Sequence, residues 1–170
     1  MIPTWADDGN LPPGIHEARW PEIVTRFGGT RARRRMLAGL AAARHFLAAE
    51  GCRRIWLDGS FVTDVERIDE RAPRDFDACW DIRDADLSRL ALRAEEFFEF
   101  RVGHPAQKRR WGGEFFPVRG PVPPGGIDQV SFFQTDRAGR PKGIVLLALD
   151  PTTMVEVARF LEEGEESVEE

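Results

Sequence analysis

Two short apolar segments, at 54–58 and 76–82, most narrowly limit how this chain can fold. The first reads RIWLD and is followed at once by Gly-Ser. The second reads FDACWDI, in which apolar residues alternate with two aspartates and a cysteine. Alternation with a period of two predicts strands. The second strand then has one apolar face and one acidic face.

The segment from Thr30 to Gly51 has the clearest helical pattern in the chain. Its apolar residues recur at three- and four-residue steps, Thr30 is a typical N-cap and Gly51 is a typical C-terminal stop. The residues at 84–98 also predict a helix, with Asp84 near its start. DPTTMVEVARFLEE, at 150–163, predicts a last helix with a proline at an early position.

Two further strands are predicted at 113–118 and 143–149, where the sequence reads GEFFPV and GIVLLAL. The run from Ile127 to Gln134 fits a strand or a helix, because it is too short for its period to separate the two. Helices and strands alternate along the chain, which predicts an α/β or α+β sheet domain. We expect residues 1–170 to form a single domain, since a chain of this length can bury one core and no long linker divides it.

Charge and cysteine content limit the compartment and the partners. Six glutamates at 162–170 more than account for the net charge of −5, and we expect this run to be solvated and disordered. Cys52 and Cys79 are the only cysteines, which is typical of reduced core thiols and too few for a paired-cysteine zinc site. The sequence has no long apolar run and no signal-peptide pattern, so we expect a cytoplasmic protein without membrane contact.

Four arginines crowd the first turns of the long predicted helix: Arg31, Arg33, Arg34 and Arg35. The helix dipole favours acidic side chains at this end, so the cluster needs an anionic partner. The simpler interpretation is a solvated helix face with glutamates nearby in space. The alternative is contact with RNA or with a phosphorylated ligand.

Asp75 and Asp77 form a D-x-D pattern at the second predicted strand. Side chains two residues apart on a strand point the same way, so both carboxylates lie on one face, where they suit Mg²⁺. Gly59 lets backbone approach a phosphate closely, and Ser60 offers an amide and a hydroxyl. Singly, these pairs also fit a wet strand face and an ordinary turn. Together they predict a site for a metal and a phosphate.

This combination resembles the nucleotidyltransferase superfamily. The family pattern is an apolar residue, then Gly followed by Gly or Ser, a spacer, and Asp-x-Asp or Asp-x-Glu; here it reads LDGS at 57–60 and PRDFDACWD at 73–81. With GIHEARW upstream and FFQTDRAGRPKGIVLLAL downstream, the chain looks more narrowly like a poorly characterised bacterial and phage-borne branch of that superfamily. The resemblance covers most of residues 11–150.

The resemblance implies a mixed β-sheet flanked by helices and a nucleotidyltransferase activity. Such an enzyme transfers a nucleoside monophosphate from an NTP and uses Mg²⁺. Carried onto this chain, the resemblance implies that Gly59 and Ser60 bind the triphosphate. It also implies that Asp75 and Asp77 hold the metal.

A third carboxylate usually completes the metal site of this superfamily. Glu114 in GGEFFPV is our candidate, because Phe115 and Pro117 would then lie on the opposite face of its strand. An ordinary exposed strand glutamate is the competing interpretation of this residue. Asp128 is the alternative third ligand.

The chain departs from the family pattern in its spacer, 61–74, which at fourteen residues is longer than usual. Asp64-Val65-Glu66 stands where a basic residue is expected, although three arginines follow in the same loop. Lys142 in GRPKGI is a further candidate phosphate contact, with an ordinary turn lysine as the simpler interpretation. Structural roles are expected for all three histidines: His16, His45 and His104.

Two classes of function are therefore compatible with the sequence. In the first, the protein is an enzyme that moves NMP from an NTP to a hydroxyl on RNA, protein or a small molecule. It would work within a toxin-antitoxin or phage-defence pair, with a partner protein that helps to recognise the acceptor. In the second, it is an inactive binding module, an antitoxin or adaptor that uses the Arg31 to Arg35 face. The intact Asp75 and Asp77 favour the enzyme, because two like charges side by side are costly without a metal to bind.

Overall fold

The computed structural model describes residues 1–99, 101–119 and 128–149, which contain a five-stranded mixed sheet. The strands are β1 (Gly14–Ala18), β2 (Arg54–Asp58), β3 (Phe76–Asp81), β4 (Gly113–Val118) and β5 (Gly143–Ala148). Their order across the sheet is β1-β5-β2-β3-β4. The β1–β5 and β3–β4 pairs are parallel, and β2 is antiparallel to both of its neighbours. The predicted α/β class is confirmed.

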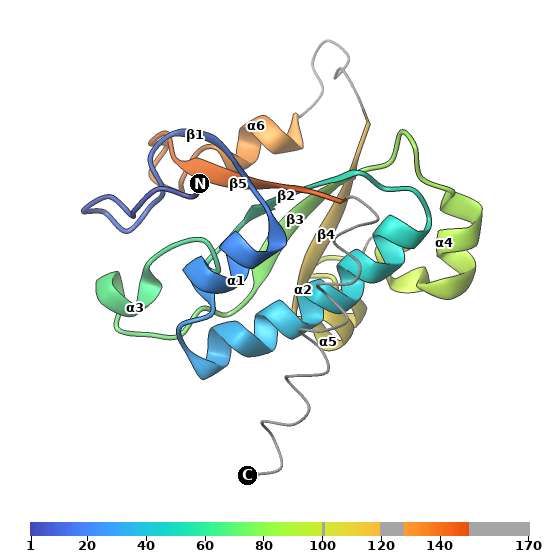
Figure 1. Cartoon of the computed structure of the whole chain (residues 1–170), viewed down its shortest axis with the longest axis horizontal. Helices are drawn as coiled ribbons and strands as arrows, with labels where there is room; N and C mark the ends of the chain where they lie inside the picture. The colour runs from blue at the N-terminus through green and yellow to red at the C-terminus, as the bar shows by residue number, and fades with distance from the viewer. Residues whose placement is uncertain (100, 120–127, 150–170) are drawn as a thin grey trace.

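Helices lie on both faces of this sheet. They are α1 (Trp20–Phe27), α2 (Arg31–Ala49), α3 (Val65–Ile68), α4 (Leu87–Arg93), the 3₁₀ turn η1 (Glu95–Phe98), α5 (Pro105–Trp111) and α6 (Gln129–Phe133). Figure 1 shows α1, α2 and α5 on one face and α6 on the other. In the part of the chain described here, no helix is long and apolar enough to cross a membrane.

The strands at 54–58, 76–82, 113–118 and 143–149 were predicted to within one residue at their ends. The ambiguous run at 127–134 contains the helix α6, which begins after the N-cap Asp128. The predicted helix at 84–98 is confirmed in part. The helix α4 begins after the N-cap Asp86, close to the predicted start, but it is interrupted at Ala94 before η1. The predicted last helix at 150–163 and the glutamate run at 162–170 lie outside the described residues.

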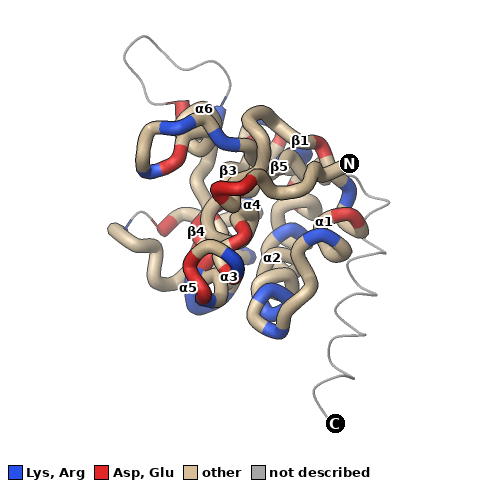
Figure 2. Tube along the Cα trace, turned by 90° about the vertical axis from the view of Figure 1, so that its left-hand side faces the viewer, with Lys and Arg blue, Asp and Glu red and all other residues tan. Residues whose placement is uncertain are grey.

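Charged residues of both signs are interspersed over the side of the molecule that carries α3. Figure 2 shows Lys and Arg next to Asp and Glu along α1 and α3 and in the segment that follows α6. A nucleic acid is usually bound by a patch or stripe of one sign. The described residues on this side therefore offer ion pairs rather than a continuous basic stripe.

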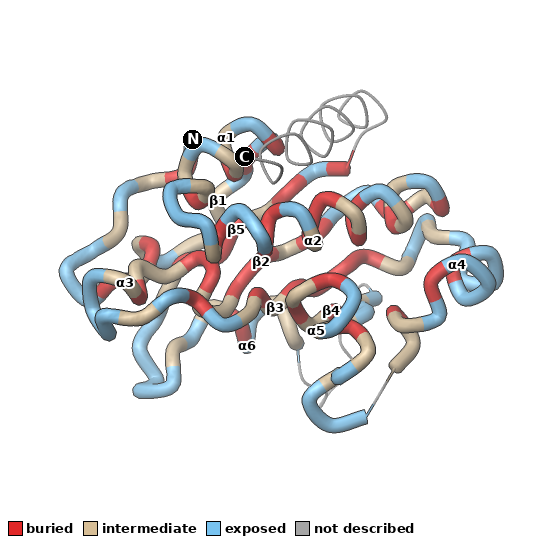
Figure 3. The backbone as a smooth tube through the Cα atoms, turned by 90° about the horizontal axis from the view of Figure 1, so that it is seen from below, coloured by how far each residue is buried: buried red, intermediate tan, exposed pale blue. Residues whose placement is uncertain are grey.

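The main core lies between the sheet and the face covered by α1, α2 and α5. Phe76, Ala78 and Trp80 of β3 are fully buried there, as the alternation in the sequence predicted. Buried and exposed residues alternate along α2 (Figure 3), whose Leu37 and Leu40 are completely buried. Each such side chain contributes about 1.5–3 kcal/mol. Thr30 caps this helix as predicted, because its hydroxyl accepts a hydrogen bond from the Arg33 N–H.

The opposite face of the sheet is only partly acidic, which corrects the expectation from the alternation in β3. Cys79 is completely buried and packs with Phe133 of α6 and Ile144 of β5. Asp81 is bound by the Arg83 side chain. The other carboxylates of this face on β2, β3 and β4 lie at the beginning of β3 and at the strand ends beside it.

Candidate active site

Four carboxylates meet at one end of β2, β3 and β4, and we call them the strand-end cluster: Asp58, Asp75, Asp77 and Glu114. Asp77 is the register partner of Asp58 on β2 and of Glu114 on β4. Neighbouring strands lie about 4.8 Å apart, and register partners face the same side of a sheet. Asp75 directly precedes β3. The structure thus brings the D-x-D pair together with Glu114 and with a fourth carboxylate, Asp58, that sequence reasoning missed.

Gly59 lies directly against Asp77. Its φ angle is +82°, in the left-handed region, and a Cβ atom added there would lie 2.9 Å from Asp77 Oδ2 and 3.0 Å from the Asp77 nitrogen. Both the backbone conformation and the space therefore require glycine. The neighbour that Gly59 accommodates in the structure is the Asp77 carboxylate, and the approach of this backbone to a phosphate stays a prediction.

The Ser60 hydroxyl links the turn after β2 to the beginning of β3. It donates a hydrogen bond to the Asp75 carbonyl oxygen at 3.0 Å and accepts one from the Arg74 N–H at 2.9 Å. Because these bonds fix the backbone at 74 and 75, Ser60 sets where the Asp75 side chain begins. In this structure its hydroxyl therefore positions a carboxylate, and contact with a phosphate remains a prediction.

Lys108 of α5 and His104, the N-cap residue of that helix, bind Glu114. Lys108 Nζ lies 2.5 Å from Glu114 Oε1 and 3.0 Å from Asp75 Oδ2, so its ammonium group bridges two members of the strand-end cluster. His104 Nδ1 lies 2.9 Å from Glu114 Oε2. Residues four apart on a helix share a face, and this spacing was the available signal for both. Sequence analysis gave His104 a structural role only and gave Lys108 none.

Lys142 binds the remaining edge of the strand-end cluster. Its Nζ lies 2.6 Å and 2.9 Å from the two carboxylate oxygens of Asp58. The side chains of Lys142 and Asp58 are only 12% and 7% exposed. The sequence raised Lys142 as a phosphate contact that points into a cleft. The structure instead pairs it with a carboxylate at the end of β2.

The pKa values of two members of the strand-end cluster, Asp58 and Asp77, are raised by burial, and for Asp58 the charge of Lys142 opposes the rise. Burial, together with the charges of Asp75, Asp58 and Glu114, raises the pKa of Asp77 to about 7. Burial also acts to raise the pKa of Glu114, but hydrogen bonds from Lys108 and His104 outweigh it and hold that pKa below its usual value. The same Glu114 contact, with that to Asp75, raises the pKa of Lys108. Asp77 is thus the carboxylate whose charge is compensated least.

The donor set of the strand-end cluster fits a hard divalent cation, since all four members offer carboxylate oxygens. A cation beside Asp77 would relieve the repulsion that raises its pKa. The side chains are not in the geometry of a formed site, however. Among the described residues, no three His, Cys, Asp or Glu side chains are grouped as metal ligands.

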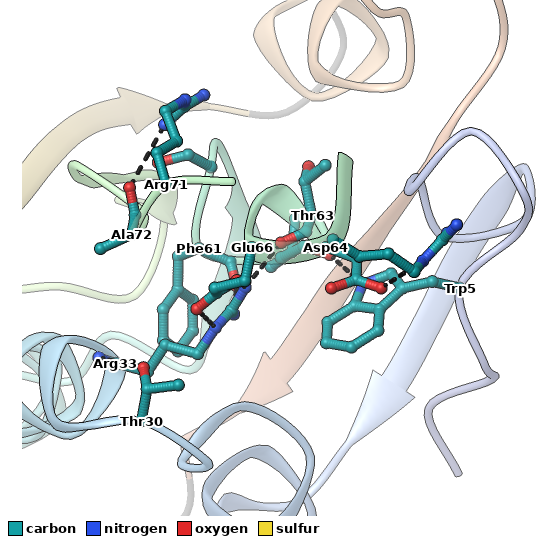
Figure 4. Close-up of polar contacts among 12 residues, drawn as sticks. Trp5, Thr30, Arg33, Phe61, Thr63, Asp64, Glu66, Arg71 and Ala72 are labelled. Atoms are coloured by element: carbon teal, nitrogen blue, oxygen red, sulfur yellow. Dashed lines mark hydrogen bonds and ion pairs between the residues drawn. The ribbon is translucent and has the colours of Figure 1, made fainter. Parts of the chain in front are cut away.

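The arginine cluster at the beginning of α2 does not form one face. Arg33 is buried, and its guanidinium group donates to both carboxylate oxygens of Glu66 at 2.7 Å and 2.6 Å (Figure 4). It also donates to the carbonyl oxygens of Phe61 and Thr63. The other three members are exposed: Arg31, Arg34 and Arg35. The expected glutamate is Glu66, but it does not belong to a solvated face. It holds the buried Arg33 side chain together with the Phe61 and Thr63 carbonyl oxygens, and we call this group the clamp.

This clamp explains the unexpected acidic stretch at 64–66. Glu66 is there as the partner of Arg33, and Asp64 accepts a hydrogen bond from Arg67. Arg71 likewise pairs with an acid of the same loop, Asp69. The spacer arginines that could have replaced the expected basic residue are therefore largely occupied by local ion pairs.

A surface hollow of about 430 Å³ lies beside the clamp rather than at the strand-end cluster. Its lining is Thr30, Ala32, Glu66, Glu70, Arg71 and Ala72. Figure 4 shows that Glu66, on one wall, is turned toward Arg33. Because the lining mixes two acids with one base, it does not select a ligand of either charge.

The other candidate residues have structural roles. Asp128 caps α6, where it accepts hydrogen bonds from the Val130 N–H and the Ser131 hydroxyl, so it is committed away from the cluster. His16 lies 2.7 Å from the Pro12 carbonyl oxygen, the backbone bond that the sequence analysis expected. His45 is exposed and packs edge-on against the neighbouring Phe46 ring.

The chain belongs to a family of unknown function, DUF6932, whose model matches residues 3–148. This range contains all five strands of the described sheet and every member of the strand-end cluster. No curated protein and no solved structure matches the chain. The comparisons show no link to a superfamily, so the resemblance to nucleotidyltransferases rests on sequence, chiefly on the residues at 57–60 and 73–81.

Proposed function

We propose that this protein is a metal-dependent nucleotidyltransferase whose metal is held by Asp75, Asp77 and Glu114. One observation carries the proposal. Carboxylates from separate parts of the sequence converge, through the register of β3 and β4, on the turn at Gly59. Acidic strand faces are common, but a glycine turn that abuts the central carboxylate of such a group is not required by packing alone.

Each residue of the strand-end cluster has a definite task in this proposal. Asp77 and Glu114 present their oxygens from neighbouring strands, and Ser60 fixes the backbone from which Asp75 reaches the same place. Gly59 and Ser60 would bind the triphosphate at the turn whose backbone lies against Asp77. When bound, Mg²⁺ would supply positive charge for the transferring phosphoryl group and would lower the pKa of the acceptor hydroxyl.

The acceptor in this proposal is a hydroxyl on RNA, on a protein or on a small molecule. The described domain contains one sheet with its covering helices, so we propose that a partner protein contributes to recognition of the acceptor. A toxin-antitoxin or phage-defence pair is the setting that the family resemblance implies.

A second candidate function is an inactive binding module on the same fold. The observation that favours it is the pairing of Lys108 with Asp75 and Glu114, and of Lys142 with Asp58. These ion pairs already neutralise part of the strand-end cluster without a metal. If they are permanent, the cluster is a structural network and the protein needs no nucleotide.

Transfer of label from NTPs separates the two candidates. The protein is incubated with each α-³²P-labelled NTP, Mg²⁺ and either total bacterial RNA or total bacterial protein. We expect label in one fraction with the wild type and none with the Asp75→Asn, Asp77→Asn double variant. Asp128→Asn is the matched control, because it changes a carboxylate that caps α6 and should transfer as the wild type does. Absence of label in every fraction would favour the binding module.

A further inference from the structure

The chain uses lysine at two positions only. Of its 24 Lys and Arg residues, the two lysines are Lys108 and Lys142, and every other one is arginine. Both lysines bind carboxylates of the strand-end cluster. Lysine is a compact charge on a flexible stem, whereas arginine holds a carboxylate with a rigid two-pronged fork. The basic residues at this cluster are thus of the kind that can exchange partners.

Lys108 binds the oxygens that the proposed metal would need. Its Nζ lies 3.0 Å from Asp75 Oδ2 and 2.5 Å from Glu114 Oε1. A Mg²⁺ ion takes carboxylate oxygens at about 2.1 Å and demands octahedral geometry around itself. An ammonium group bridging the same two oxygens leaves no room for such an ion. One of the two cations must therefore leave before the other can bind.

The two lysines differ in their freedom to leave. The Lys108 side chain is 38% exposed and spans two carboxylates from different strands. The Lys142 side chain is only 12% exposed, and both of its bonds go to one carboxylate, Asp58. Withdrawal of Lys108 leads to solvent, whereas withdrawal of Lys142 would leave a buried carboxylate unpaired at a large cost.

Glu114 can lose Lys108 without losing its orientation. Lys108 binds Oε1, while His104 Nδ1 lies against the other oxygen, Oε2. A carboxylate held at one oxygen by a neighbouring ring nitrogen keeps its plane when the other oxygen changes partner. On this side of the strand-end cluster, the contact of His104 with Glu114 can therefore stay while Lys108 is exchanged for another cation.

We infer that Lys108 is a resident counter-ion, which Mg²⁺ displaces from Asp75 and Glu114 while Lys142 stays on Asp58. This inference rests on the proposed function, because it names the state from which the metal site forms. These carboxylate oxygens thus have a cation as partner both before and after the exchange. It also leaves the Lys108 ammonium group free beside the metal, where a phosphate oxygen of the nucleotide is a suitable new partner.

Lysine-selective isotope labelling tests this inference on the unmodified chain. Protein labelled with ¹³C at lysine Cε gives lysine signals from two residues only, since the sequence has two lysines. Lys108→Met or Lys142→Met, whichever folds better, assigns them. Mg²⁺ is titrated into the wild type, and binding is followed in parallel by calorimetry. We expect the Lys108 signal to shift in step with the calorimetric isotherm and the Lys142 signal to stay in place.

The outcomes separate this inference from the proposed function. Mg²⁺ binding with an unmoved Lys108 signal would overturn the displacement and leave the proposed metal site standing. Absence of Mg²⁺ binding, alone and with each of the four NTPs, would overturn both. As a second measurement, Lys108→Met should bind Mg²⁺ about tenfold more tightly than the wild type, because a competing charge is gone. Equal or weaker binding by a folded Lys108→Met would also contradict displacement.

Discussion

Asp77 of β3 and Glu114 of β4 are register partners in the parallel part of the sheet, although they lie far apart in the sequence. Gly59 approaches the same Asp77 carboxylate from the turn after β2. The proposed metal site therefore depends on strand pairing. This pairing brings together the turn at Gly59, the D-x-D strand β3, and β4, which follows α5 in the chain. Each contribution can be tested by a substitution with a matched control elsewhere in the chain.

Glu114→Gln should weaken Mg²⁺ binding about 100-fold or more, because removal of even an outer-shell partner of a metal usually costs 10–100-fold in affinity. Asp128→Asn is the control, since asparagine caps a helix as well as aspartate does. Calorimetric titration of Mg²⁺ into each variant gives the comparison. If the two variants bound Mg²⁺ equally well, Glu114 would not be a ligand.

The sequence was sufficient for β2, β3, β4 and β5, whose apolar residues reflect burial in the sheet, and for the D-x-D pair beside the glycine turn, but β1 was not predicted. It could not show that Asp58 joins this group, since the residue reads as the last position of an ordinary strand. Register decides that relationship, and register depends on pairing between distant segments. Lys108 was missed for a similar reason: its role follows from how α5 packs beside β4.

Gly59→Ala should destabilise the fold more than the same change at Gly139. Both glycines have a positive φ, +82° and +78°, so alanine costs about 1 kcal/mol at either. Only Gly59 has the Asp77 carboxylate within 3 Å of the new Cβ, and such overpacking adds about 1–3 kcal/mol. Urea denaturation measures both variants. Equal losses of unfolding free energy would mean that the Asp77 contact exerts no constraint.

Asp77→Asn should raise the free energy of unfolding of the metal-free protein, relative to the wild type, by more at pH 8 than at pH 5. The pKa of Asp77 is raised to about 7 by burial and by Asp75, Asp58 and Glu114, well above its value of 3.8 in an unfolded chain. Between these two values the folded state binds a proton that the unfolded state lacks, so the free energy of unfolding falls as pH rises. Asparagine removes that loss. Urea denaturation of both proteins at the two pH values measures the difference.

Metal binding should show the opposite dependence on pH. The Asp77 carboxylate must lose its proton to bind Mg²⁺, so wild-type affinity should rise from pH 6 to pH 8 and binding should release protons. Calorimetry in buffers of different ionisation enthalpy counts these protons. The same affinity at both pH values would mean that Asp77 does not contact the ion.

Arg33→Met should cost about 3 kcal/mol or more of unfolding free energy, because it leaves Glu66 and two loop carbonyls without their buried partner. Arg31→Met, two residues away on the same helix and exposed, should change the free energy of unfolding by about 0.5 kcal/mol at most. Urea denaturation at pH 7 compares the two. A small loss for Arg33→Met would show that the spacer holds its shape without the clamp.

The most direct test of the account is calorimetric titration of the four NTPs, with and without Mg²⁺, into the wild type and into the Asp75→Asn, Asp77→Asn double variant. The account predicts that at least one NTP binds the wild type, that binding requires Mg²⁺, and that the double variant loses it while remaining folded. Failure of every NTP to bind well-folded wild type would contradict the account and would favour a binding module held together by its lysine ion pairs.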